Sequence, residues 1–218
     1  MIPRLRITDK FPHPNSCDEN GILAFGADLS PTRLMSAYRS GIFPWYSEND
    51  PIIWWSPDPR FVMELEDFKV SKSLKKSQKK FTCKIDYNFH QVIKSCANVK
   101  RKGTDKTWIL NEIIEAYETL HALGHAHSVE SYYDGELVGG LYGVVVGGVF
   151  CGESMFSTMS DASKVAYSFL IEHLKEKGFD FIDAQVYTEH LSSLGAKEIS
   201  RDEFLKKLEN SLKDVKEF

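Results

Sequence analysis

The spacing of apolar residues changes along the chain and predicts two parts. Residues 1–62 combine short apolar runs with many prolines and tryptophans, which is typical of loops and short strands. One helix is expected there, capped by Ser30, with Pro31 at its first position and Gly41 after its end. From about residue 63 the apolar spacing becomes regular. We therefore expect a small N-terminal lobe with an aromatic cluster (residues 1–62) and a second domain (residues 63–218).

The second domain opens with helical periodicity and continues with strands. Apolar residues at helical spacing predict helices over residues 70–81 and 111–123. Three strand-like runs follow at 127–133, 136–146 and 149–156, and Asp-Gly and Gly-Gly turns separate them. This arrangement predicts a meander of antiparallel strands.

The remaining pattern alternates helix and strand. The pattern predicts a helix over residues 161–177, capped by Ser160, with Phe169 facing inward. It predicts a short strand over residues 179–186. A short helix over 188–194 and a last helix opened by the capping box of Ser200 and Glu203 complete the chain. The order strand-strand-strand-helix-strand-helix predicts an α+β fold with a mostly antiparallel sheet flanked by helices. It suggests an acetyltransferase-like (GNAT-like) topology.

Composition narrows the class of protein. The 218 residues are 42% hydrophobic and 27% charged, with a net charge of −4, so any nucleic-acid contact must come from a local basic patch. We see no membrane-spanning apolar stretch and no secretory signal at the start. The scattered cysteines are typical of free thiols in a reducing cytoplasm: Cys17, Cys83, Cys96 and Cys151. A cytoplasmic location is therefore expected.

Glu153 ends an apolar, glycine-spaced run in the stretch FCGESMFS. A buried carboxylate without a partner is costly. Glu153 must therefore pair either with another group of the fold or with a ligand.

The sequence disfavours a coenzyme A site, a metal site and a hydrolase triad. Coenzyme A sites in acetyltransferase-like folds use a glycine-rich turn before a helix, and the connection over residues 155–163 has no glycine. His125 and His127 lack further ligands for a metal, which favours structural roles. Ser154, His190 and Asp183 contain the residue types of a hydrolase triad, but CGESMF is not a nucleophile-elbow motif.

Lysines at helical spacing leave the apolar residues of 70–81 on the opposite face. These lysines fit a helix face exposed to solvent. They also fit a helix that binds along a phosphate backbone. The aromatic residues of 43–61 fit a small core. Trp rings among them, and Trp108, could instead stack on a base.

The strand FIDAQV alternates, which places Asp183 and Gln185 on one face. An acid and an amide two residues apart can contact one reacting group together. An exposed strand face is the alternative, and the spacing alone does not separate the two.

Several long motifs carry a resemblance that covers nearly the whole chain. In the first lobe they are NGILAFGADLSP (20–31), YRSGIFPWY (38–46) and DPIIWWSPDPR (50–60). In the second they are GHAHSVE (124–130), FCGESMFS (150–157), ASK (162–164), and IDAQV with HLSSLGA (182–196). Together they resemble the bacterial leucyl/phenylalanyl-tRNA–protein transferases.

The resemblance implies an aminoacyltransferase that needs no cofactor and no metal. Such enzymes move Leu or Phe, sometimes Met, from aminoacyl-tRNA to acceptor proteins with N-terminal Arg or Lys, which marks them for N-end-rule degradation. It implies that Asp183 attracts or accepts the proton of the amine and that Gln185 orients the amine or the ester carbonyl. Glu153 would hydrogen-bond the substrate near the amino acid or adenosine, or recognise the acceptor's basic side chain.

The resemblance also implies the remaining binding residues. Trp45 and Trp108 would hold the terminal adenosine. The apolar side-chain pocket would be formed by Leu141, Phe150, Leu170, Leu174 and Ile182. The acceptor stem of the tRNA would contact Lys72, Lys75, Lys76 and Lys79. Thr188 stands where Asn is usual in the family, which bears on the ranking of Leu, Phe and Met.

Two other functions remain as alternatives. One is an N-acyltransferase that uses acetyl-CoA, and the other is a tRNA-binding module without catalysis. Binding of coenzyme A would favour the first. Retention of function after Asp183→Ala would favour the second.

Overall fold

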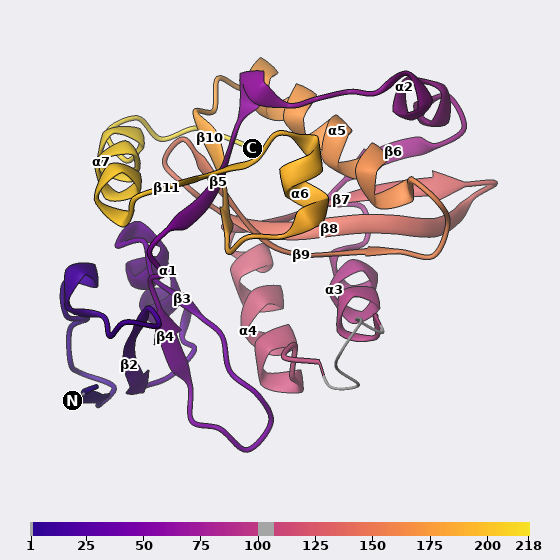
Figure 1. Ribbon diagram of the computed structural model, residues 1–218. Coiled ribbons are helices and arrows are strands. Elements are labelled where there is room, and N and C mark those ends of the chain that lie inside the picture. Colours follow the sequence, from indigo (N-terminus) through magenta and orange to yellow (C-terminus); the bar gives the residue numbers. More distant parts are fainter. Residues whose placement is uncertain (1, 100–106) are drawn as a thin grey trace.

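The computed structural model describes residues 2–99 and 107–218, whose strands form two sheets (Figure 1). The smaller sheet has the strand order β1 (Arg4–Leu5), β2 (Ile22–Gly26), β4 (Ile53–Trp55) and β3 (Phe43–Pro44). It is accompanied by the 3-10 turn η1 (Pro14–Ser16) and helix α1 (Pro31–Arg39). These elements form a small N-terminal lobe in which the side chain of Trp54 is fully buried.

The larger sheet has seven strands and mixes one parallel pair with antiparallel pairs. Its order is β11 (Lys197–Ile199), β5 (Arg60–Glu64), β10 (Phe181–Gln185), β9 (Val149–Ser157), β8 (Glu136–Val146), β7 (Ala126–Tyr133) and β6 (Thr82–Ile85). Among the strand pairs of this sheet that the described residues form, only β9 and β10 run parallel. The predicted α+β class and mostly antiparallel sheet are confirmed, and so is the order β7-β8-β9-helix-β10-helix.

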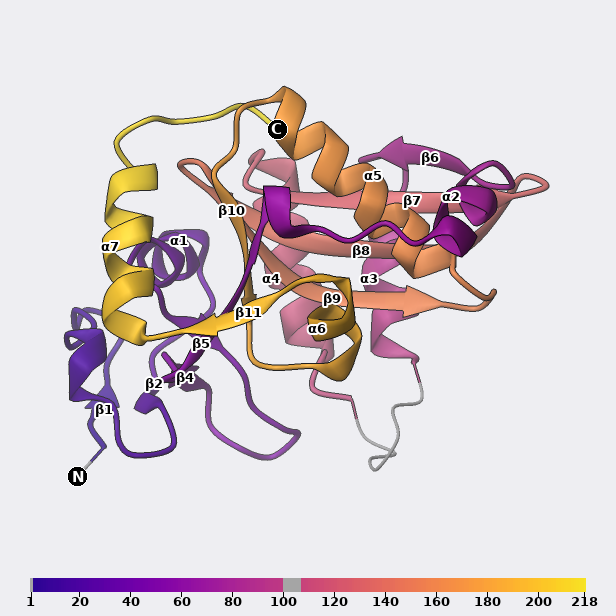
Figure 2. The same ribbon diagram turned by 45° about the horizontal axis from the view of Figure 1, so that its top comes forward.

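The helices cover both faces of the larger sheet. One face packs against α5 (Ala162–Glu176), and Figure 1 shows α2 (Lys72–Gln78) and α6 (Glu189–Leu194) on this side. The other face packs against α3 (Phe89–Ala97) and α4 (Asn111–Ala122). Helix α7 (Arg201–Ser211) lies at the β11 end of the sheet, and the turn η2 (Leu65–Asp67) follows β5 (Figure 2). Two buried apolar clusters result, and the one under α3 and α4 continues into the N-terminal lobe.

Strands β9 and β10 separate after a short parallel contact. They pair from Val149 with Phe181 to Cys151 with Asp183. Beyond that point β9 continues along β8 to Ser157, whereas β10 ends at Gln185. The sheet is therefore split between these two strands on the side of α6.

Local signals confirm several predicted boundaries. Ser30 and Ser200 cap α1 and α7 by accepting hydrogen bonds from Arg33 N and Glu203 N. The β7–β8 turn has positive φ at Asp134 and Gly135, as a tight Asp-Gly hairpin requires.

Three local predictions are wrong. Helix α2 is shorter than the predicted 70–81, because Ser71 caps it and Lys79 ends it. Ser160 does not cap α5; Asp161 occupies the cap position at φ 67°, without a capping hydrogen bond from its side chain. Phe169 does not face inward but is 38% exposed, since the buried stripe of α5 passes through its neighbours Ser168 and Leu170.

The sequence pattern missed β5, although it lies at the predicted domain boundary. Residue 62 is the middle of β5, which pairs with β10 and β11 in the larger sheet. The division at residue 62 stays a prediction. The sequence pattern also did not predict helix α3 or the edge strands β6 and β11. No helix among the described residues is both long enough and apolar enough to span a membrane.

Gly195 allows a test of how α6 is anchored. A Cβ at Gly195 (φ 117°) would lie 2.2 Å from the carbonyl oxygen of Asp67. Gly135 has φ 85° with no atom near a built Cβ, so it serves as the matched control. We expect Gly135→Ala to lower the free energy of unfolding by about 1–2 kcal/mol, the cost of a left-handed residue. Gly195→Ala should cost at least twice as much in urea titrations; equal losses would contradict the close contact.

Candidate active site

A cavity of 350 Å³ lies beside the separation of β9 and β10. Its lining comes from the N-terminal lobe, the segment before α4, the large sheet, α5 and α6. Eight residues of the predicted catalytic and substrate-binding set line it: Trp45, Trp108, Leu141, Phe150, Glu153, Leu170, Ile182 and Gln185. Segments far apart in the sequence therefore meet at one site.

The apolar part of the cavity is the face of the sheet that α5 covers. Leu141, Phe150 and Ile182 come from three neighbouring strands, and Leu170 faces them from α5. Leu174, predicted as a further wall, does not line the cavity. It lies one helical turn beyond Leu170 and is fully buried in the core behind it.

Trp45 and Trp108 line the cavity from outside the large sheet. Trp45 follows β3 and is 40% exposed. Its ring lies 5.6 Å from that of Trp55, whose indole N–H donates to the carbonyl oxygen of Trp45. This tryptophan therefore offers an aromatic face on a fixed stretch of backbone.

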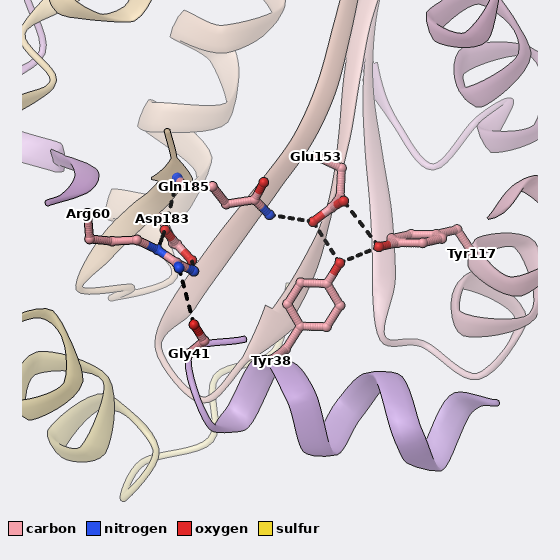
Figure 3. A network of polar contacts seen from close by, with 7 residues as sticks. All are labelled: Tyr38, Gly41, Arg60, Tyr117, Glu153, Asp183 and Gln185. Atoms are coloured by element: carbon pink, nitrogen blue, oxygen red, sulfur yellow. Dashed lines mark hydrogen bonds and ion pairs between the residues drawn. The ribbon is translucent and has the colours of Figure 1, made fainter. Parts of the chain in front are cut away.

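Glu153 has partners in the fold. Its carboxylate accepts hydrogen bonds from the Tyr38 hydroxyl (2.7 Å), the Tyr117 hydroxyl (3.1 Å) and Nε2 of Gln185 (2.7 Å) (Figure 3). The two tyrosine hydroxyl oxygens are also in contact with each other. Because each hydroxyl carries one proton, a hydrogen bond between them replaces one of the two to an ionised Glu153. Tyr38 comes from α1 and Tyr117 from α4, so three separate elements converge on this carboxylate.

Burial sets the protonation of this cluster. It raises the pKa of Glu153 from 4.5 to about 7, although the hydrogen bonds from Tyr38, Gln185 and Tyr117 oppose the shift. The negative charge of Asp183 raises this pKa further. Burial, followed by the charge of Glu153, raises the pKa values of both tyrosines well above their usual range. The tyrosines are therefore hydrogen-bond donors at neutral pH, and Glu153 titrates in the neutral range.

Asp183 does not line the cavity. Its carboxylate is 1% exposed and forms a two-pronged ion pair with Arg60 on β5, through Nε (2.8 Å) and Nη2 (2.6 Å). Arg60 also donates to the Gly41 carbonyl oxygen (3.1 Å), and its guanidinium lies over the rings of Phe43 and Phe204. The carboxylate is thus fully engaged within the protein.

The alternation from which a shared face of Asp183 and Gln185 was predicted does not continue to the end of β10. The register with β5 shifts between these two residues, and Gln185 has φ 65°. The amide of Val186 donates to the Ala184 carbonyl oxygen, which closes a tight turn around Gln185. The backbone N–H of Gln185 donates to Oδ1 of Asp183 (3.0 Å). This turn directs the Gln185 side chain into the cavity, while Asp183 faces Arg60.

Sequence reasoning missed three residues of this network: Tyr38, Arg60 and Tyr117. Tyr38 and Arg60 do lie in the family-like motifs of residues 38–46 and 50–60. Their spacing offers no sign that they meet β9 and β10, because these contacts span more than a hundred positions. The motifs were the only available signal.

The other candidates lie in different settings. Ser154 and His190 line the cavity, but the Arg60-bound Asp183 does not complete a triad with them. His127 hydrogen-bonds Asp86 (2.7 Å). In residues 2–99 and 107–218 no group of three His, Cys, Asp or Glu side chains is arranged to hold a metal. The four lysines Lys72, Lys75, Lys76 and Lys79 are exposed on and after α2.

Comparison with known proteins now decides the family. Residues 62–209 match the family described as leucyl/phenylalanyl-tRNA protein transferase, and residues 27–58 match its N-terminal domain. The chain belongs to this family. It is 65% identical over 209 residues to the leucyl/phenylalanyl-tRNA–protein transferase of Sulfurimonas denitrificans, covering 95% of this chain and 92% of that one. The relative of the same name from Nitrosospira multiformis is 52% identical, with 95% and 91% covered.

Solved structures similar to this family member include acetyltransferase-type folds. L-PGS from Bacillus licheniformis has a TM-score of 0.43 and 11% identity, over 77% of this chain and 56% of that one. A GCN5-related N-acetyltransferase from Kribbella flavida has a TM-score of 0.39 and 10% identity, over 78% and 61%. Neither likeness bears on the activity of this chain.

The protonation of Glu153 predicts a pH dependence of stability. Because its pKa is raised on folding, from 4.5 to about 7, the folded protein holds a proton there that the unfolded chain has lost. The free energy of unfolding should therefore fall as the pH rises from about 4.5 to 7, by roughly 2–3 kcal/mol from this group.

The matched variant is Glu153→Gln, which carries no titrating group. Urea titrations between pH 4.5 and 8 should give a shallower decline for this variant than for the natural chain. Parallel curves for the two proteins would show that the folded-state pKa of Glu153 is not raised.

Proposed function

We propose that the protein transfers Leu or Phe from aminoacyl-tRNA to the N-terminal amine of a protein. The observation that carries this proposal is the cavity itself. An apolar pocket adjoins a hydrogen-bonded Glu153–Gln185 pair, and tryptophans line the same cavity. These are the parts that an amino-acid side chain, a reacting ester and a terminal adenosine require. Membership of a family named for this transfer supports the same activity.

The chemistry is the conversion of an ester into an amide. The amine nitrogen attacks the ester carbonyl, a C–N bond forms, and the C–O bond to the tRNA ribose breaks. The amine loses a proton and the ribose oxygen gains one. An N-terminal amine has a pKa of about 7.7–8.0, so part of it is neutral near pH 7. Alignment of amine and ester can contribute roughly 7–11 kcal/mol, and no external energy source is needed because the ester is already activated.

Gln185 and Glu153 are the groups that would contact the reacting atoms. Because Nε2 of Gln185 donates to Glu153, its carbonyl oxygen is left to accept a hydrogen bond from the amine. Glu153, with a pKa of about 7, can exchange a proton with an amine of similar pKa. Asp183 would act through Gln185, because it binds the backbone of the turn that presents this amide. This differs from the sequence-based hypothesis, in which Asp183 itself takes the proton.

The pocket suits the side chains of Leu and Phe, and also that of Met. Leu141, Phe150, Leu170 and Ile182 are all apolar. A wall of this kind separates apolar side chains of different size only weakly. The adenosine would stack on Trp45 and Trp108.

The tRNA acceptor stem would approach along α2. Besides the cavity described above, a cleft of 270 Å³ is lined by Lys69, by Ser73 of α2, by Lys164 of α5 and by Ser193 of α6. Asp161 also lines this cleft, and the ammonium group of Lys164, 3.9 Å from its carboxylate, partly offsets its charge. Helix α6 also lines the main cavity through His190 and Leu191. A phosphate backbone could therefore follow positive charge from α2 to the cavity. The resemblance to the family is the basis for two further parts of the proposal. These are acceptors that begin with Arg or Lys, and the entry of the products into N-end-rule degradation.

An acetyl-CoA-dependent activity is disfavoured by Asp161. It occupies the cap position of α5, where the pyrophosphate of coenzyme A would have to bind. Its carboxylate, held by Ser77 (2.8 Å), would repel that group. Tight binding of coenzyme A in calorimetry would overturn the proposed function.

The transfer itself is the first test. Incubation with radiolabelled Leu-tRNA or Phe-tRNA and a peptide beginning with Arg should label the peptide. Gln185→Met keeps the size of the side chain but removes its amide, and we expect transfer to fall by about 10²-fold or more. The control is Tyr187→Phe, two residues further along the chain, where the side chain is 54% exposed. Full activity of Gln185→Met would refute the role of Gln185, and no transfer by the natural chain would refute the proposed reaction.

The lysines of α2 provide an independent test. The double variant Lys75→Glu/Lys76→Glu should weaken tRNA binding and reduce the slope of log K against log salt by about 1–2. Lys206→Glu/Lys213→Glu makes the same charge change at exposed positions on and after α7, at the other end of the sheet, and should change neither. Filter-binding titrations between 50 and 200 mM salt measure both. Equal slopes for all three proteins would exclude the α2 lysines from the interface.

A further inference from the structure

Phe218, the last residue of the sequence, fills an aromatic socket under α5. Its ring stacks on His127 of β7 (centroids 4.4 Å apart) and on Phe150 of β9 (5.5 Å). It also meets the edges of His173 of α5 (4.7 Å) and of Phe179 (6.2 Å). Four elements or segments thus contact this one side chain of the tail.

The tail is attached to the sheet before it reaches the socket. The turn between β8 and β9 hydrogen-bonds the end of α7 through Gly148 N and Ser211 O (3.0 Å), and Lys216 N donates to Gly147 O (3.4 Å). Figure 2 shows the tail running from α7 to the end of α5. Backbone hydrogen bonds at Ser211 and Lys216 therefore fix the tail, and ring contacts fix Phe218 two residues further on.

Phe150 separates Phe218 from the cavity. Phe150 lines the cavity and is 1% exposed, whereas Phe218 does not line it. On β8 the backbone of Gly143 faces the Phe150 ring, and a Cβ there would lie 2.5 Å from the ring. The ring is thus confined between Gly143 and Phe218, with its remaining free side toward the cavity.

We propose that Phe218 is a positioning residue that sets the depth of the aminoacyl side-chain pocket by holding the ring of Phe150. This inference rests on the proposed function of the cavity. Tightly packed side chains move into space that is vacated next to them, as far as their neighbours permit. Without the Phe218 ring, Phe150 can withdraw from the cavity toward α5, which lengthens the pocket.

A longer pocket changes the choice between substrates. Phe is longer than Leu, so it gains contacts with a withdrawn Phe150, whereas Leu leaves a gap. One methylene of fit in an apolar pocket changes selectivity by about 10-fold or more. Phe218→Ala should therefore raise the ratio of kcat/KM for Phe-tRNA to that for Leu-tRNA by about tenfold. Phe218→Leu, which keeps part of the volume, should raise it by a smaller factor and remains informative if the Ala variant does not fold.

The control is Val215→Ala, on the same tail but 79% exposed, which should leave the ratio unchanged. A purely structural role of Phe218 would lower both kcat/KM values together. A ratio within twofold of that of the natural chain in both Phe218 variants would overturn the inference.

Binding separates this inference from the proposed function. The probes are 3′-amino-3′-deoxyadenosine carrying Leu or Phe in an unreactive amide, titrated by calorimetry. The ratio of their Kd values should shift toward Phe in Phe218→Ala by the same factor. An unshifted Kd ratio overturns the role of Phe218 even if transfer is observed. A shifted Kd ratio with no transfer by the natural chain refutes the proposed reaction and supports the role of Phe218.

Discussion

The buried ion pair of Arg60 and Asp183 is the contact on which the architecture of the cavity depends. Two charges removed from water are tolerated only when each is fully satisfied, and here Arg60 binds both carboxylate oxygens and the Gly41 carbonyl. Removal of one partner from such a pair typically costs about 3–5 kcal/mol. The pair joins β5 to β10, and Asp183 in turn binds the N–H of Gln185. A left-handed residue other than glycine costs about 1–3 kcal/mol, and this hydrogen bond helps to offset that cost.

The same region joins the N-terminal lobe to the large sheet. Tyr38 reaches from α1 to Glu153 on β9, Tyr46 donates to Glu112 on α4, and Gly41 receives Arg60 from β5. Each contact is polar and lies beside or behind the cavity. The lobe therefore contributes more than Trp45 to the site. Its Tyr38 donates a hydrogen bond to Glu153, which opposes the rise in the pKa of this carboxyl on burial.

Much of the fold could be predicted from the sequence because its signals are local. The Asp134–Gly135 turn, the caps Ser30 and Ser200 and the apolar alternation of β7 to β9 depend only on neighbouring residues. The bulge at Gln185 could not be predicted, since the partners that stabilise it are distant in sequence or lie in the backbone. Leu174 was assigned to the pocket from the resemblance, which does not indicate where along α5 the cavity ends. The roles of Tyr38 and Tyr117 depend on contacts across 115 and 36 positions, which periodicity does not report.

The separation of β9 from β10 has a consequence for how the site can vary. Because two parallel strands diverge after Cys151 and Asp183, the backbone of the sheet itself contributes to the hollow. Side chains along its walls can then be exchanged without loss of the hollow itself. The strand pairing therefore determines where the hollow lies, and the sizes of the side chains on its walls determine which substrates fit.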